Sequence, residues 1–115
     1  MKVRCNIKLR TLLNIFNFIM NLGTTIKTIR KRNRQTQTEF ALTCGITQTY
    51  LSQIENNGRE PNLSTLKQIS EALKIPLPIL FFLSMDEQDV QQNKRKAFEI
   101  IGPSVKSLIN EFFSV

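Results

Sequence analysis

The sequence of 115 residues contains no histidine and only two cysteines, Cys5 and Cys44. Without histidine, the chain cannot form a Ser-His-Asp triad, a Cys-His dyad or a histidine-ligated metal site. Two thiols are too few for a thiolate metal cage, and without a disulfide framework they are typical of a reducing compartment. We therefore expect a cytoplasmic protein with no metal and no cofactor.

Glycine and paired carboxylates are also scarce. The four glycines lie far apart, so the chain has no glycine-rich phosphate-binding loop. The nine acidic residues form no recognisable pair for general acid–base chemistry. The length is sufficient for one domain and an extension, since domains commonly have about 100–150 residues. We therefore expect that the protein is not an enzyme.

Positive charge is concentrated at the N-terminal end. The net charge is +7, from 16 basic and 9 acidic side chains. Residues 1–34 contain nine basic residues and no acidic one, whereas residues 35–115 contain seven basic and nine acidic residues. A basic end on a nearly neutral body indicates a polyanionic partner, either nucleic acid or an anionic membrane surface. Charge alone does not distinguish these two partners.

Residues 1–19 resemble a signal peptide, because four basic residues precede an apolar run. Asparagines interrupt this run, no small-residue cleavage site follows it, and it is shorter than the ~20 apolar residues that span a bilayer. The segment after it, from Met20, could begin a protein by itself. We therefore weigh upstream sequence from a misplaced start, an amphipathic helix and an export signal, and we expect no membrane partner.

The periodicity from residue 22 onward predicts helices. Leu22, Ile26 and Ile29 form the apolar stripe of a first helix that ends near the basic run 30–34. Thr36 and Glu39 have the spacing of a capping box at the start of a second helix. Gly45 is expected to end that second helix.

Three further helices are expected between residues 47 and 83. Thr47 is a suitable N-cap for a third helix through Asn56, and a turn follows at residues 57–61. Asn62 can cap a fourth helix, and Pro76 and Pro78 delimit a fifth helix through Leu83. The apolar face of the fourth helix consists of Leu63, Leu66, Ile69 and Leu73. No stretch alternates for long enough to form a strand, so we predict an all-α fold.

Residues 84–115 are expected to form a helical extension. Residues 84–87 have the spacing of another capping box, and Gly102 and Pro103 are expected to break the helix that follows. Beyond this break lies a full amphipathic face: Val105, Leu108, Ile109, Phe112 and Phe113. Two uses of this face compete: packing on the apolar helix at residues 77–83, or a two-fold dimer interface.

The second and third helices have helix-turn-helix spacing around Gly45. At 100° per residue, five polar side chains of the third helix fall within one arc of about 140°. They are Gln48, Thr49, Ser52, Gln53 and Asn56. Uncharged hydrogen-bonding side chains suit the reading of base edges, although a polar helix face is also common on any protein surface.

Residues 22–83 resemble the Xre-type, phage-repressor-like helix-turn-helix family. The resemblance rests on the order and spacing of these segments: Leu22 to Arg30, Thr36 to Ala41, Cys44-Gly45-Ile46, Tyr50 to Glu55, Pro61, and Leu66 to Leu73. It implies a five-helix DNA-binding domain that is usually dimeric on a two-fold operator.

The resemblance also implies roles for single residues. Gln48, Thr49 and Gln53 match positions that face bases, and Gln37 matches a phosphate contact. Tyr50 and Ser52 are expected at the groove wall, and Arg59 at the DNA backbone. Structural alternatives are a first-turn role for Gln37, a core position for Tyr50 and a solvated Arg59. Arg30 and Glu55 match an ion pair, which we interpret as mainly structural.

We therefore predict a sequence-specific binder of double-stranded DNA, a small bacterial transcriptional regulator. It would bind as a homodimer to an inverted-repeat operator, through a domain at 22–83. Residues 84–115 would form the extension, and 1–19 stay unassigned. The alternative is a protein-interaction module, such as an antitoxin or assembly partner, that uses the Phe-rich C-terminal helix.

Overall fold

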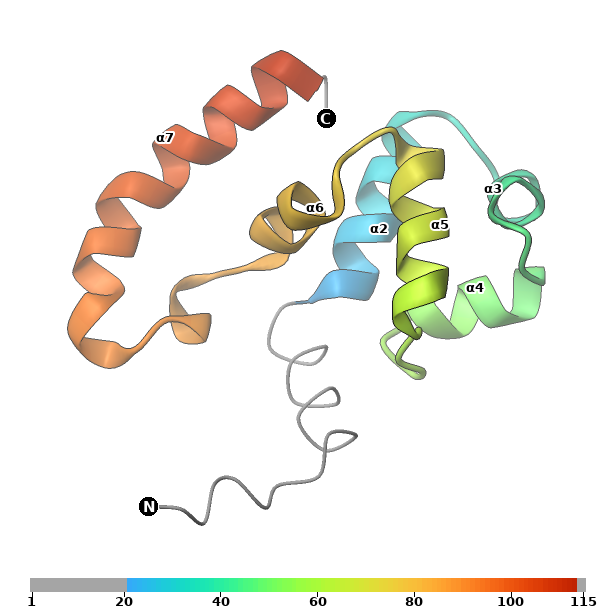
Figure 1. Cartoon of the computed structure of the whole chain (residues 1–115), viewed down its shortest axis with the longest axis horizontal. Coiled ribbons are helices and arrows are strands. Elements are labelled where there is room, and N and C mark those ends of the chain that lie inside the picture. Colours follow the sequence, from blue (N-terminus) through green and yellow to red (C-terminus); the bar gives the residue numbers. More distant parts are fainter. Residues whose placement is uncertain (1–20, 114–115) are drawn as a thin grey trace, which may run out of the picture.

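The structure, a computed structural model, describes residues 21–113, which contain six α-helices and no strand (Figure 1). The helices are α2 Leu22–Arg32, α3 Gln37–Cys44, α4 Gln48–Glu55, α5 Leu63–Leu73, α6 Leu77–Ser84 and α7 Arg95–Phe113. Two 3-10 turns, η2 Glu87–Asp89 and η3 Gln92–Lys94, precede α7. The all-α prediction is confirmed, and the segment 1–19 lies outside the described residues.

Helices α3, α4 and α5 each begin at a side-chain cap. Thr36 Oγ1 accepts the Glu39 N–H at 3.1 Å, and Glu39 Oε1 accepts the Thr36 N–H at 2.9 Å, so the capping box is present. Thr47 accepts the Tyr50 N–H at 3.0 Å, and Asn62 Oδ1 accepts the Thr65 N–H at 2.8 Å. These bonds satisfy amides that have no partner within the helix, which explains why the helices begin at these residues.

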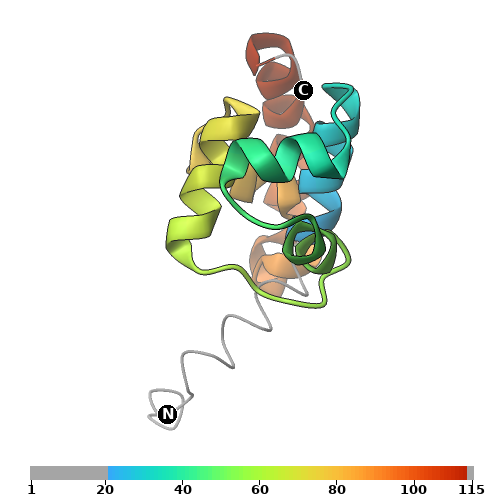
Figure 2. The same cartoon turned by 90° about the vertical axis from the view of Figure 1, so that its right-hand side faces the viewer.

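Gly45 forms the sharp turn between α3 and α4. Its φ of 74° lies in the left-handed region, where glycine carries no steric penalty. Because the chain turns there, α3 lies across α4 in Figure 2, and the two helices pack together. The prediction that Gly45 ends the second helix is confirmed.

The hydrophobic core lies among α2, α3, α4, α5 and α6. Its fully buried large side chains are Phe40, Ile26, Leu51, Ile54, Ile69 and Leu80. Leu63 was expected on the inner face of α5, but 58% of its surface is exposed. It is the first residue of α5 and lies about 90° around the helix from the centre of the stripe formed by Leu66, Ile69 and Leu73.

Ser84 does not begin a helix, contrary to the sequence prediction. It is the last residue of α6, and its buried hydroxyl donates to the Leu80 carbonyl at 2.9 Å. Asp86 instead accepts the Gln88 N–H at 2.9 Å, at the start of the 3-10 turns. A serine hydroxyl can bond backbone groups at either end of a helix. The spacing between Ser84 and Glu87 therefore does not identify which end of a helix Ser84 occupies.

The predicted break at Gly102 and Pro103 is also wrong, because α7 continues through both residues. A proline within a helix leaves the carbonyl four residues earlier without its N–H partner. Pro103 and Glu99 are both exposed, so water can bond that carbonyl. Gly102 is buried and lies beside the Phe98 ring, and a Cβ there would make an ordinary contact with that ring at 3.4 Å.

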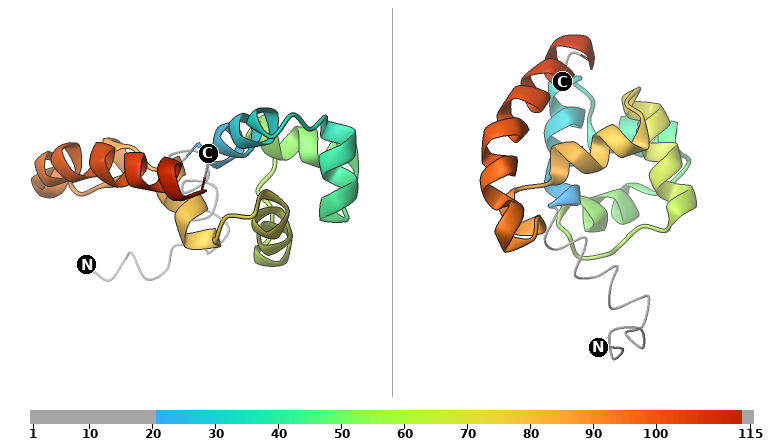
Figure 3. Two further views of the ribbon diagram at one scale, coloured as in Figure 1. Left: turned by 90° about the horizontal axis from the view of Figure 1, so that it is seen from above. Right: turned by 60° about the vertical axis from the view of Figure 1, so that its left-hand side comes forward.

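Helix α7 lies on the opposite side of α6 from α3 and α4 (Figures 1 and 3). Leu80 of α6 is buried in the core, whereas Phe82 of α6 contacts the Phe98 ring of α7 at a centroid distance of 6.2 Å. Within residues 21–113, no helix is both long and apolar enough to cross a membrane.

Candidate nucleic-acid interface

Helix α4 presents its polar arc to the surface. Leu51, Ile54 and Glu55 are its buried residues. Its exposed residues include Gln48, Thr49 and Gln53, whereas Tyr50 and Ser52 are half-buried. The side chains expected to face bases are therefore on the accessible side of α4, and Tyr50 and Ser52 lie at its edge.

Arg30 of α2 and Glu55 of α4 form a buried ion pair. Arg30 Nε lies 2.6 Å from Glu55 Oε2, and Arg30 Nη2 lies 3.0 Å from Oε1. The remaining guanidinium nitrogen, Nη1, donates to the Gln35 carbonyl at 2.7 Å. Arg30 is 5% exposed and Glu55 is 3% exposed, so two-point pairing offsets the cost of removing both charges from water.

Two glutamines extend this ion pair to the surface. Gln37 Nε2 donates to Glu55 Oε1 at 2.9 Å, and Gln48 Nε2 donates to Gln37 Oε1 at 2.7 Å. The chain of contacts thus runs from α2 through α4 and α3 back to the first residue of α4. Gln37 and Gln48 were predicted as separate contacts, and their bond to each other was not expected.

A second cluster joins three of the predicted residues. The Arg59 guanidinium lies over the Tyr50 ring, 4.9 Å from its centroid, in cation–π geometry. Arg59 Nη1 also donates to Gln53 Oε1 at 3.4 Å, a long hydrogen bond. Tyr50 packs against the core at the same time. Arg59 is therefore held beside the exposed face of α4, and Thr49 lies exposed on that same face.

Sequence reasoning missed the connection between the loop after α4 and the start of α2. Asn57, with a left-handed φ of 59°, accepts the Gly23 N–H on its side-chain oxygen at 3.1 Å. A Cβ on Gly23 would collide with the Ile54 carbonyl oxygen, so only glycine permits this approach of α2 and α4. The Asn-Gly pair at 57–58 indicated a turn, but nothing in the sequence linked it to Gly23.

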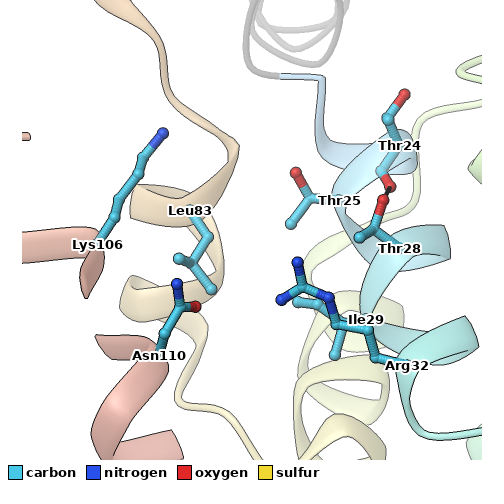
Figure 4. Close-up of a pocket in the computed structure, with 8 residues that line it drawn as sticks. All are labelled: Thr24, Thr25, Thr28, Ile29, Arg32, Leu83, Lys106 and Asn110. Carbon is cyan, nitrogen blue, oxygen red and sulfur yellow. Dashed lines mark hydrogen bonds between the residues drawn. The ribbon is translucent and has the colours of Figure 1, made fainter. Parts of the chain in front are cut away.

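A groove lies away from these residues, between α2 and α7 (Figure 4). Thr24, Thr25, Thr28, Ile29 and Arg32 line it from α2, Leu83 from α6, and Lys106 and Asn110 from α7. None of the residues expected to contact bases, the groove wall or single phosphates on α3, α4 and the loop after α4 lines this groove. Among the described residues, no group of three metal-ligating side chains comes together.

Cys44 is buried at the end of α3. Desolvation raises the pKa of its thiol from 9.0 to about 11, so the thiol stays protonated at neutral pH. Because the thiolate is the reactive form, Cys44 acts as a small core side chain and not as a nucleophile.

The helix-turn-helix family model matches residues 26–80, which include the whole of α3, α4 and α5. Over these residues the chain is similar to phage-repressor-like helix-turn-helix proteins. The family model that matches is a helix-turn-helix and not a catalytic domain, which agrees with the expectation that the chain is not an enzyme.

Two relatives of this helix-turn-helix chain come from Bacillus phage phi105. Its immunity repressor protein is 39% identical over 56 residues, which are 49% of this chain and 39% of the repressor. The 10 kDa protein of its ImmF control region is 41% identical over 59 residues, which are 51% of this chain and 66% of that protein. The matched part is therefore less than two thirds of either relative.

A solved structure shares the fold of the chain. The clp gene regulator ClgR from Corynebacterium glutamicum superposes with a TM-score of 0.54 at 17% identity. The superposition covers 78% of this chain and 87% of that protein. At this identity, the likeness concerns the fold alone.

Proposed function

We propose that this protein binds double-stranded DNA in a sequence-specific manner and regulates transcription in a bacterium or its phage. The observation that carries the proposal is the uncharged polar arc of α4, exposed beside the ordered pair Gln37 and Gln48. An α-helix with such side chains fits the major groove, where each base pair has a distinct pattern of donors and acceptors. The relationship to a phage immunity repressor supports the same function.

Each element has a role in this proposal. Gln48, Thr49 and Gln53 contact base edges in the major groove. Gln37 contacts a phosphate, together with the amides at the N-terminus of α3. Arg59, held over Tyr50, contacts the backbone, and Ser52 lies at the groove wall. The basic residues at 27–34 add an attraction that does not depend on sequence and that weakens with salt.

The proposal includes a homodimer on an inverted repeat. A single recognition helix reads only a few base pairs, and a two-fold dimer doubles the length of the site by using the same base contacts twice. Residues 22–83 form the DNA-binding domain, and residues 84–115 form an extension that is free for another task.

Selection from a randomised duplex library with the full-length protein tests this function. We expect enrichment of an inverted repeat whose half-sites lie a whole number of helical turns apart, about 10 base pairs per turn. Enrichment of a single half-site would retain sequence-specific binding and reject the dimer. No enrichment at moderate salt would reject DNA reading and favour the protein-interaction module instead.

A further inference from the structure

Helix α7 carries an apolar stripe that no other described residue covers. Ile101 is 56% exposed, Leu108 is 53% exposed and Phe112 is 77% exposed. At 100° per residue, these three positions lie within about 40° of one another. Ala97 and Val105 flank them, so the stripe contains no charged residue over four turns of helix.

A neighbouring face of the same helix packs on the rest of the protein. Gly102 and Ile109 are the buried residues of α7, and Phe98 contacts Phe82 of α6. Lys106 Nζ donates to the Met85 carbonyl at 2.9 Å beside them. This inner face lies about 90° around the helix from the stripe. The amphipathic face predicted from the sequence is therefore divided, with one part packed inward and the other open to solvent.

We infer that the open stripe, formed by Ile101, Leu108 and Phe112, is the surface on which a second copy of this chain packs. The inference rests on the proposed function, because it assigns the surface of the proposed homodimer. A two-fold axis through the stripe would place the stripe of one copy against the same stripe of the other. Because the stripe carries no charge, no like-charge repulsion arises at the centre of the contact.

The area of the stripe fits a homodimer. With about 200 Å² for a fully exposed large apolar side chain, the stripe exposes roughly 400 Å² in each copy. Two such patches account for about two thirds of the ~1,200 Å² that a specific interface buries at the low end. That proportion agrees with the apolar share of homodimer interfaces, about 65%. The flanking polar residues of α7 would supply the rim.

The position of the stripe also suits a second copy. Helix α7 lies across α6 from α3 and α4, so self-association through α7 leaves the polar arc of α4 uncovered (Figure 1; Figure 3, left). An occupant of α7 therefore does not compete with an occupant of α4.

A matched pair of variants tests the inference. Ile100 and Ile101 are adjacent and similarly exposed, 68% and 56%, but Ile100 points about 100° away from the stripe. In sedimentation equilibrium of the full-length protein, we expect a wild-type dimer and an Ile100→Asp dimer. For Ile101→Asp, we expect a rise of at least tenfold in the dimer dissociation constant. Circular dichroism verifies that each variant is folded, and Phe112→Ala is the substitute if Ile101→Asp does not fold.

Each contrary result overturns the inference. A monomeric wild type at 100 micromolar would mean that something other than a second copy covers the stripe. Equal dissociation constants for the wild type and the folded stripe variant would place the interface elsewhere. Equal weakening by Ile100→Asp and Ile101→Asp would mean that the effect is not specific to the stripe. Sedimentation needs no DNA, so a failure of the DNA-binding proposal is recognised separately, by the absence of any enriched sequence.

Discussion

Gln37 and Gln48, on different helices, are joined by a hydrogen bond of 2.7 Å. Gln37 in turn donates to Glu55, whose carboxylate is fixed by Arg30. The side chain proposed to read a base is therefore held by a chain of contacts that ends in the interior. Ordering a side chain before binding reduces the entropy that binding must overcome, so this arrangement favours affinity as well as specificity.

Replacement of Gln48 by alanine should weaken operator binding and relax one or two base positions. A good bidentate contact to a base contributes about 1–3 kcal/mol of discrimination, so we expect a loss of affinity of roughly 5- to 150-fold. Binding is measured by fluorescence anisotropy on the selected operator and on single-base variants of it. Gln68→Ala is the control, because Gln68 is an exposed glutamine of α5. Unchanged base preference in Gln48→Ala would mean that α4 is not the reading helix.

Substitution of Glu55 by glutamine should destabilise the fold strongly. The change keeps the shape of the side chain but leaves the buried Arg30 without a counter-charge, at a cost of about 3–5 kcal/mol. Urea unfolding measures this cost, with Glu71→Gln on the exposed face of α5 as the control. The double variant Arg30→Met/Glu55→Met should recover much of the loss. A Glu55→Gln cost similar to that of the control would disprove a structural role for the pair.

Gly23→Ala should destabilise the protein because the added methyl group collides with the Ile54 carbonyl. Overpacking of this kind costs about 1–3 kcal/mol, since α2 and α4 must separate. Gly58→Ala is the matched control, because a Cβ there has as its nearest neighbour the Gln53 carbonyl oxygen at 3.5 Å, an ordinary contact. The two free energies of unfolding are compared in urea, and equal values would show that the α2–α4 contact is not tight.

Alkaline pH should reduce stability through Cys44. The unfolded thiol ionises near pH 9.0, whereas the folded thiol stays protonated up to about pH 11. The unfolded chain therefore loses this proton first, and stability falls as pH rises between these values, by about 1 kcal/mol at pH 10. The check is urea unfolding at pH 8 and pH 10, compared with Cys44→Ala. A parallel pH dependence in the two proteins would contradict the raised pKa of Cys44.

Local chemistry made much of the fold predictable from sequence. Thr36, Thr47 and Asn62 each cap a helix through a bond to the third residue after them, and this spacing is visible in the chain itself. Ser84 has the same spacing to Glu87, yet it ends a helix, because packing of α6 on the core determines where the chain turns. A local pattern gives the type of cap, and tertiary contacts determine whether it is used.

The candidate site was predictable residue by residue but not as an arrangement. The polar arc of α4 follows from helical periodicity alone. The bond between Gln37 and Glu55 joins residues 18 positions apart, and no periodicity relates residues on different helices. Likewise, the spacing of apolar residues in α7 identified one amphipathic face but not its division into a packed part and an open part.

Helix α6 makes the stability of the two parts of the chain interdependent. Leu80 is enclosed by the helix-turn-helix core, and Phe82, two residues later, contacts α7. If α7 detached, Phe82 would lose its contact with Phe98 and become exposed to water. Helix α6 would then hold Leu80 less firmly in the core. A single short helix thus gives the extension a thermodynamic effect on a domain whose reading surface it does not touch. We therefore expect the two parts to melt in one cooperative transition.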